Sequence, residues 1–290
     1  MTRREPRERG FALVVVLWAA IILAILTGGV VGMARTGLRI AAHQTSAAAL
    51  RTSADAALNL LLLQLIDPRG APMPRLDGVP FEMTFEGRTM RLTVQDQAGK
   101  IDLNSASGTV LQSLLVACGL DDSAAAALTD KILDWRERWA GKRVNGAKAD
   151  DYRAAGYPYG PREDFFPRVE ELKLVMGMTR SVYDRIAPAL TVYSQSPAVD
   201  INVAPPAVLR LLPDMDPDKV QQILGARADP DAGGDQSLAV QSAPTGGMLI
   251  GHAVEITVVA RAADDTMATR TAIVRFTGQQ QAPLWIYRWD

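Results

Sequence analysis

The strongest constraint in this sequence is the uncharged stretch from Phe11 to Ala34, which follows a short basic segment ending at Gly10. An α-helix rises about 1.5 Å per residue, so roughly 20 apolar residues cross a bilayer. By the positive-inside rule, the arginines before the stretch keep the N-terminus in the cytoplasm. We therefore predict that residues 11–34 span the membrane. A cleaved signal peptide is the alternative, since Gly32-Met33-Ala34 offers a cut site between small residues.

The helical pattern continues beyond the apolar stretch. No proline occurs until Pro68, and apolar residues recur at helical spacing, so we expect one helix that ends near Ile66. Its second half is amphipathic and must bury one face against another part of the chain. The residues expected on that face are Ile40, Ala47, Leu50, Ala54, Leu58, Leu61, Leu62 and Leu65.

Two regions of alternating apolar and polar residues predict β-strands. Residues 81–94 alternate around Glu86-Gly87, which indicates a hairpin. Residues 252–278 repeat the pattern with a turn near Asp264-Asp265, and "PLWIYRW" at the end of the chain reads as a last strand. The segment between these regions is helical. We therefore predict an α+β fold in which a long N-terminal helix packs on a small antiparallel sheet, interrupted by an inserted all-α domain.

The helical segment contains three helix–turn–helix phrases. We expect the first to open at Asn104 and Ser105, the second to open at Asn202 with its second helix starting at Pro217, and the third to break at Gly177-Met178. These phrases resemble the helix-hairpin-helix module, which often binds the DNA backbone. A membrane-anchored, competence-type DNA-binding protein is therefore an alternative function.

The turns of these phrases argue against phosphate binding. A DNA-binding hairpin holds a phosphate with free backbone N–H groups at a glycine-rich turn. Here the turns carry Asp214 and Asp216, or Asp121 and Asp122, whose carboxylates would repel a phosphate. We therefore prefer a structural role for the hairpins.

The composition gives no sign of an active site. The net charge is −1, which argues against non-specific binding to nucleic acid. Cys118 is the single cysteine, and His43 and His252 are the only histidines. Nucleotide-binding, zinc-protease and hydrolase motifs are missing from the sequence. We expect no enzymatic activity.

The N-terminal region resembles the type IV pilins and the type II secretion pseudopilins. It consists of a basic leader that ends in Gly10, then Phe11, and then an apolar span that continues into an amphipathic helix. The resemblance implies that a prepilin peptidase cuts between Gly10 and Phe11 and that the new N-terminal Phe11 is methylated. Most members carry Glu at the fifth mature residue, where it pairs with the N-terminal amine of a neighbouring subunit. Val15 stands at that position here, which favours a place at the end of a filament.

Several rare phrases sharpen the resemblance. They are "GKIDLNSAS", "ILDWRE", "DYRAAGYPYGPRED", "VEELKLVMGMT", "LTVYS" and "INVAPPAVLRLLPDM". Their order is similar to that in the minor pseudopilin K family of type II secretion systems. The implied organisation is a leader at 1–10, a helix at 11–66, pilin-like strands at 67–97, an inserted helical domain at 98–235 and returning strands at 236–290.

The resemblance also implies a function and partners. Members of that family are non-enzymatic subunits at the tip of the pseudopilus, where they form a ternary complex with minor pseudopilins I and J. Minor pseudopilin H and the major pseudopilin G lie below them. The complex initiates assembly on an inner-membrane platform and supports export of folded proteins. We expect a single-pass inner-membrane protein with its C-terminal domain in the periplasm.

The family resemblance finally implies a calcium site in the loop after "DWR". Calcium prefers several oxygen ligands. The residues that could supply them here are Asp134, Glu137, Asp150 and Asp151. Arg138 and Trp139 stand where relatives often carry acidic residues, and Lys148 stands where Glu is common, so a charged loop docked by Trp135 and Trp139 is the alternative.

Overall fold

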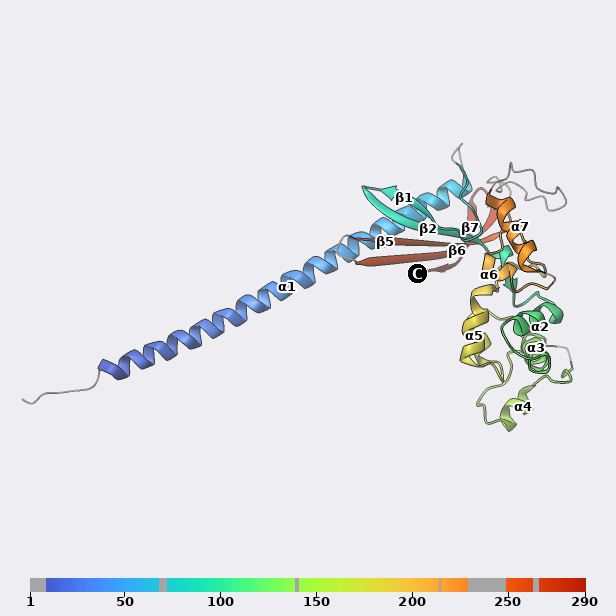
Figure 1. Ribbon diagram of the computed structural model, residues 1–290, viewed down its shortest axis with the longest axis horizontal. Helices are drawn as coiled ribbons and strands as arrows, with labels where there is room; N and C mark the ends of the chain where they lie inside the picture. Colours follow the sequence, from blue (N-terminus) through green and yellow to red (C-terminus); the bar gives the residue numbers. More distant parts are fainter. Residues whose placement is uncertain (1–8, 68–71, 139–140, 214, 229–248, 263–265) are drawn as a thin grey trace, which may run out of the picture.

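The protein consists of a long helix, a sheet packed on its C-terminal part, and a helical unit at the far end of the sheet (Figure 1). This computed structural model describes residues 9–67, 72–138, 141–213, 215–228, 249–262 and 266–290. Helix α1 (Arg9–Ile66) has 58 residues, about 87 Å at 1.5 Å per residue. Its N-terminal part projects freely beyond the sheet (Figure 1).

The second half of α1 buries one face on the sheet, mainly against β5 (Ala253–Arg261) and β6 (Met267–Gln279). Two of the residues expected on this face differ in their burial: Ile40 is exposed and Ala47 only half-buried, because the sheet begins to cover the helix near Leu50. The remaining expected residues are confirmed as buried: Leu50, Ala54, Leu58, Leu61, Leu62 and Leu65.

The sheet has five antiparallel strands in the order β1-β2-β5-β6-β7. The predicted hairpin is β1 (Phe81–Phe85) and β2 (Arg88–Asp96), joined by Glu86 and Gly87 with φ of 48° and 73°. Both residues are left-handed, as a type I′ turn requires. The predicted last strand is β7 (Ala282–Trp289). The turn expected at Asp264-Asp265 lies outside the described residues.

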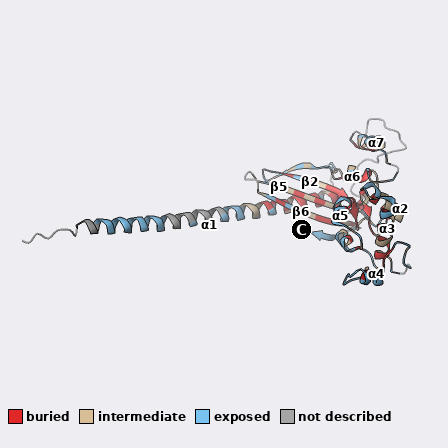
Figure 2. Ribbon diagram, turned by 60° about the horizontal axis from the view of Figure 1, so that its bottom comes forward, coloured by how far each residue is buried: buried red, intermediate tan, exposed pale blue. Residues whose placement is uncertain are grey.

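One core joins α1 to the sheet. Leu92 and Val94 of β2, Ile256 and Val258 of β5, and Val274 of β6 are fully buried against the helix. Burying each such side chain stabilises the fold by about 1.5–3 kcal/mol. Figure 2 shows where this burial begins: the described residues in the projecting part of α1 are exposed, and burial starts beside the strands.

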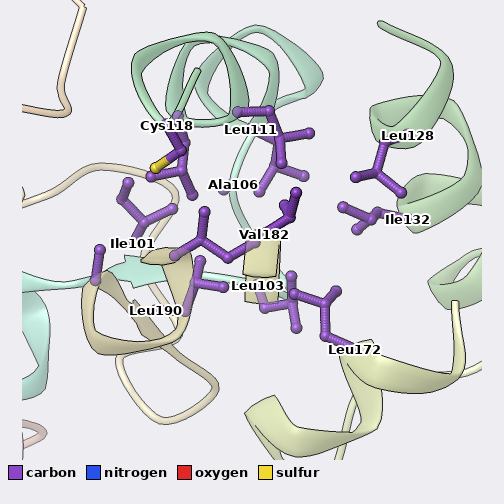
Figure 3. Close-up of a cluster of buried hydrophobic side chains, with 14 of the residues drawn as sticks. Ile101, Leu103, Ala106, Leu111, Cys118, Leu128, Ile132, Leu172, Val182 and Leu190 are labelled. Atoms are coloured by element: carbon purple, nitrogen blue, oxygen red, sulfur yellow. The ribbon is translucent and has the colours of Figure 1, made fainter. Parts of the chain in front are cut away.

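The helical unit lies between β2 and β5 in the sequence. Its helices are α2 (Gly108–Ala117), α3 (Asp122–Arg136), α4 (Ala149–Ala154), α5 (Arg180–Ile186), α6 (Pro206–Leu209) and α7 (Pro217–Ala228). A parallel pair, β3 (Ile101–Asp102) with β4 (Leu190–Thr191), ties its two halves together and was not expected from the sequence. The unit has its own core, built around residues such as Leu103, Leu111, Ile132 and Val182 (Figure 3).

The prediction of three helix–turn–helix phrases was partly wrong about where their helices begin. Asn104 and Ser105 do not open a helix: Asn104 donates its side-chain amide to the Phe166 carbonyl, and Ser107 caps α2 instead. Asn202 bonds to Asp200, and the helix after it, α6, has only four residues. The third phrase begins with a 3₁₀ helix, η2 (Val169–Leu174). The predicted break at Gly177 is confirmed by its positive φ, and Gly119, between α2 and α3, also has positive φ.

Mostly polar contacts join the helical unit to the sheet. Gln97, 2% exposed, accepts a hydrogen bond of 2.7 Å from the Thr191 hydroxyl. The Lys100 ammonium lies 2.9 Å from the Glu255 carboxylate of β5. Arg275 of β6 donates to the Tyr193 carbonyl at 2.5 Å. The two units therefore have separate apolar cores and are held together by hydrogen bonds and ion pairs.

His252 forms a titratable pair with Asp96 at the end of β2. Its Nδ1 lies 2.6 Å from the buried carboxylate of Asp96, and this hydrogen bond raises the pKa of His252 above its ordinary value. Asp200 also favours the protonated ring, whereas burial and Arg275 oppose it.

We predict that the His252–Asp96 pair stabilises the fold most under acidic conditions. A raised folded-state pKa gives stability that is fully present below the unfolded pKa, about 6.5 for His, and lost as the pH rises through the folded value. The loss of Tm caused by His252→Gln should therefore be larger near pH 5.5 than near pH 8.5. Equal losses at both pH values would contradict a charged His252 in the pair.

Candidate functional site

The first candidate site is the exposed N-terminal part of α1. From Leu13 to Thr27 every described side chain is exposed and apolar or uncharged, including Trp18. Water-exposed apolar surface of this extent is costly, so this part of α1 requires a lipid or protein environment. Val15 is half exposed, and its side chain carries no charge into that environment.

Among the described residues, Ile40–Ile66 is long and apolar enough to cross a membrane, but 44% of its most apolar 18-residue segment is buried inside the protein. That segment is the core helix of the sheet unit. The exposed stretch Leu13–Thr27 is shorter, with 15 described residues. Our prediction of a span at residues 11–34 therefore rests on the sequence together with the exposure of Leu13–Thr27.

The predicted processing site lies at the start of α1. The helix begins at Arg9, two residues before Phe11, so the Gly10–Phe11 bond falls in its first turn. Helix ends vary by one or two residues between definitions. The burial of Gly10 and the Phe11 side chain are not described, and the cleavage stays a prediction.

The second candidate site is the carboxylate loop, which we define as residues 134–151. Asp134, at the end of α3, is fully buried. Its carboxylate accepts hydrogen bonds from the Arg143 guanidinium at 3.0 Å and from the Arg143 backbone N–H at 3.2 Å. Arg143 also contacts Glu137 at 2.6 Å. One guanidinium therefore compensates both acids.

Lys148, near the end of the same loop, contacts the residues at its beginning. Its ammonium donates to the backbone carbonyls of Asp134 and Glu137, at 3.1 and 3.0 Å, and lies 3.5 Å from the Glu163 carboxylate. Two carbonyls and a carboxylate around one cation are oxygen ligands of the kind that a hard metal ion would use. In this chain the ligands surround the chain's own ammonium group.

The other two predicted ligands are also paired with basic side chains. Asp151 accepts a hydrogen bond from the Lys142 ammonium at 2.5 Å, which lowers the pKa of Asp151. Asp150 pairs with Arg153 at 2.6 Å on the surface. Among the described residues no group of three or more His, Cys, Asp or Glu side chains could hold a metal ion. The structure thus places a basic group beside each predicted calcium ligand.

We predict that calcium has little effect on this protein. A bound ion would have to displace Lys148 or Arg143 from their oxygen partners, at the cost of burying an unpaired cation. Millimolar calcium or a chelator should therefore shift the Tm of the purified protein by less than about 1 °C. A calcium-dependent rise of several degrees would show that the predicted site is occupied.

An aromatic cluster supports the carboxylate loop. Trp135 is buried and stacks on Phe166, with 6.1 Å between ring centroids, and donates its indole N–H to Glu171. Burial raises the pKa of Tyr152 to about 12, so its hydroxyl stays neutral and accepts a hydrogen bond from the Met176 N–H. Trp135, one of the two predicted docking residues, is buried in this cluster, whereas Trp139 lies outside the described residues.

Sequence reasoning treated Lys148 as a departure from the acidic pattern of relatives and missed Arg143 altogether. The "NGAK" phrase offered a signal: at Gly146 an added Cβ would lie 1.8 Å from an Asp134 carboxylate oxygen. That close approach requires glycine and brings the loop onto Asp134.

The hairpin turns are not free to hold phosphate. Asp121 caps α3 by accepting from the Ala124 N–H at 2.8 Å, and Asp216 caps α7 by accepting from the Lys219 N–H at 2.7 Å. Both helix N-termini that a DNA backbone would need are thus occupied by carboxylates. The geometry gives no support to the DNA-binding alternative.

Comparison with known proteins connects these features. A family model described as "Type II secretion system (T2SS), protein K" matches residues 90–195. "Type II secretion system protein K" of Pseudomonas aeruginosa is 23% identical over 243 residues, which are 76% of this chain and 72% of that protein. The chain is therefore similar to the type II secretion protein K family over most of its length.

Two further relatives agree with the protein K assignment. The Dickeya chrysanthemi protein K is 29% identical over 124 residues, 41% of this chain and 34% of that protein. A chain from the crystal structure of the GspK-GspI-GspJ complex of enterotoxigenic Escherichia coli matches with a TM-score of 0.55 at 15% identity. The match covers 87% of this chain and 98% of that one, so the two share a fold. Protein K is a pseudopilin of the secretion envelope machinery, as the sequence had indicated.

Proposed function

We propose that this protein K caps the tip of a type II secretion pseudopilus and initiates its assembly together with minor pseudopilins I and J. The observation that carries the proposal is the match in fold, over nearly the whole of that chain, to a protein solved in a GspK-GspI-GspJ complex. In the same proposal, minor pseudopilin H and the major pseudopilin G follow below the tip. No enzymatic step is part of this function.

The shape of the molecule supports a terminal position. A filament of stacked subunits requires every subunit to fit between its neighbours, and the helical unit extends beyond the end of the sheet (Figure 1). A subunit at the tip has no neighbour on that side. The uncharged Val15 agrees with this position. A carboxylate buried in the bilayer needs the N-terminal amine of a neighbouring subunit as a partner, whereas Val15 needs no such partner.

The exposed α1 supplies the anchor in this proposal. Its apolar N-terminal part lies in the inner membrane as a single span with the N-terminus in the cytoplasm, and the sheet and the helical unit lie in the periplasm. Prepilin peptidase cuts between Gly10 and Phe11. The inner-membrane assembly platform then extracts the mature subunit.

The test is isolation of the full-length protein from cells that express the secretion system. The proposal expects minor pseudopilins I and J to co-purify at equal amounts, and deletion of the gene to stop both pseudopilus formation and export of folded proteins. Recovery of bound DNA in place of pseudopilins, or normal pseudopili without the protein, would contradict it.

A further inference from the structure

The edge strand β7 carries four large, exposed apolar side chains close together. Trp285, Ile286, Tyr287 and Trp289 are 64%, 55%, 37% and 39% exposed. In the described part of the chain, β7 pairs only with β6, so its outer backbone N–H and C=O groups face solvent. Proteins normally protect such an edge with charges or a covering loop, because an open edge invites pairing with another chain.

Both faces of β7 contribute to this surface. Ile286 lies opposite Val274 and therefore on the α1 face, but α1 packs on β5 and β6 and leaves Ile286 open. Trp285 lies opposite Arg275 on the other face. Next to it, the Tyr287 ring packs at a tilt against Tyr193 of the helical unit, with centroids 5.1 Å apart. The surface thus continues from the sheet to the junction.

From this exposure we propose that β7 is a docking edge for the edge strand of another pilin-like subunit whose anchoring helix points in the same direction as α1. The proposal rests on the proposed function and specifies the surface that this function needs. The four exposed side chains leave on the order of 400 Å² of apolar surface, about half of the roughly 800 Å² that each partner contributes to a stable interface. The backbone of the paired strands and the flanking loops supply the rest of the interface area.

A second copy of this chain does not fit the edge. Two β7 edges can pair only antiparallel, through a two-fold axis perpendicular to the sheet. That axis would point the two projecting parts of α1 in opposite directions (Figure 1), so both could not enter one membrane. The β1 edge of a second copy is a poor match, because its exposed side chains are Glu82 and Thr84.

The first test places a photo-crosslinking amino acid at Trp285 in the full-length protein, in cells that express the secretion system. A matched control carries it at Thr84, which is exposed on the opposite edge strand. We expect a covalent adduct between position 285 and a pilin-like subunit, identified by mass spectrometry, and at least about tenfold less adduct from position 84. An adduct with a second copy of this chain, or equal yields at both positions, would overturn the proposal.

The second test weakens the edge. Trp285→Ser with Trp289→Ser should lower the amount of co-purified pseudopilin by at least about tenfold, as expected for the loss of two central aromatic anchors. Phe165→Ser is the control, since Phe165 is equally exposed but lies in the helical unit. Trp→Phe at both positions should keep the partner. If wild-type protein binds pseudopilins and the double variant binds them equally well, only the docking edge is wrong; if wild-type protein binds none, the proposed function is wrong.

Discussion

Arg143→Ala is expected to destabilise the helical unit by about 3–5 kcal/mol, because it leaves the fully buried Asp134 carboxylate without its guanidinium partner. The carboxylate loop should open, and limited proteolysis should cut within residues 141–148 under conditions that leave the wild-type protein intact. The free energy of unfolding is measured by urea denaturation followed through tryptophan fluorescence.

Arg153→Ala is the matched control, since Arg153 also pairs with an aspartate but on the exposed surface. Its cost should stay below about 1 kcal/mol. The double variant with Asp134→Asn should recover part of the stability lost with Arg143, because it removes the unpaired charge. Equal losses in the free energy of unfolding for Arg143→Ala and Arg153→Ala would show that the buried Arg143–Asp134 pair does not stabilise the loop.

Gly99→Ala is expected to separate the helical unit from the sheet. An added Cβ at Gly99 would lie 2.3 Å from the Val203 carbonyl oxygen and 2.8 Å from the Ala204 Cα, and backbone atoms cannot move away as a flexible side chain can. We expect a loss of several kcal/mol, at the upper end of single substitutions. The sheet should become accessible to proteases at residues 95–100, whereas the core of the helical unit stays folded.

Gly141→Ala controls for the change of residue type, because an added Cβ at Gly141 has no neighbour within 4 Å. It should leave the Tm within about 1 °C of the wild-type value. A Gly99→Ala protein with wild-type Tm and wild-type proteolysis would show that the junction can shift enough to accept a methyl group.

The sequence was most informative where one local pattern determines the structure. The strands followed from alternation and from Glu86-Gly87, whose left-handed conformations make the hairpin turn. Helical spacing correctly predicted the buried face of α1 from Leu50 onward. The pattern could not show where the sheet stops covering the helix, and for that reason Ile40 was wrongly predicted to be buried. Asn104 looked like a helix cap, yet its side chain bonds to Phe166, 62 residues away.

The candidate site was predicted less completely than the fold. Acidic residues were noticed because they could bind calcium, but their partners come from residues several positions away in a loop without periodicity. Arg143 reaches both Asp134 and Glu137 only because Gly146 lets the loop approach α3. Exposed strand β7 was predicted as a strand, whereas its free edge depends on the strand order, which no local pattern encodes.

The most direct test of the account is the N-terminus of the mature protein, determined by mass spectrometry on protein extracted from the membrane. A pseudopilin at the filament tip is expected to begin at Phe11, with a methylated amine and without the ten-residue leader. A mature chain that begins at Arg35, which would mean a cleaved signal peptide, or an intact chain that begins at Met1 in cells with active prepilin peptidase, would contradict it.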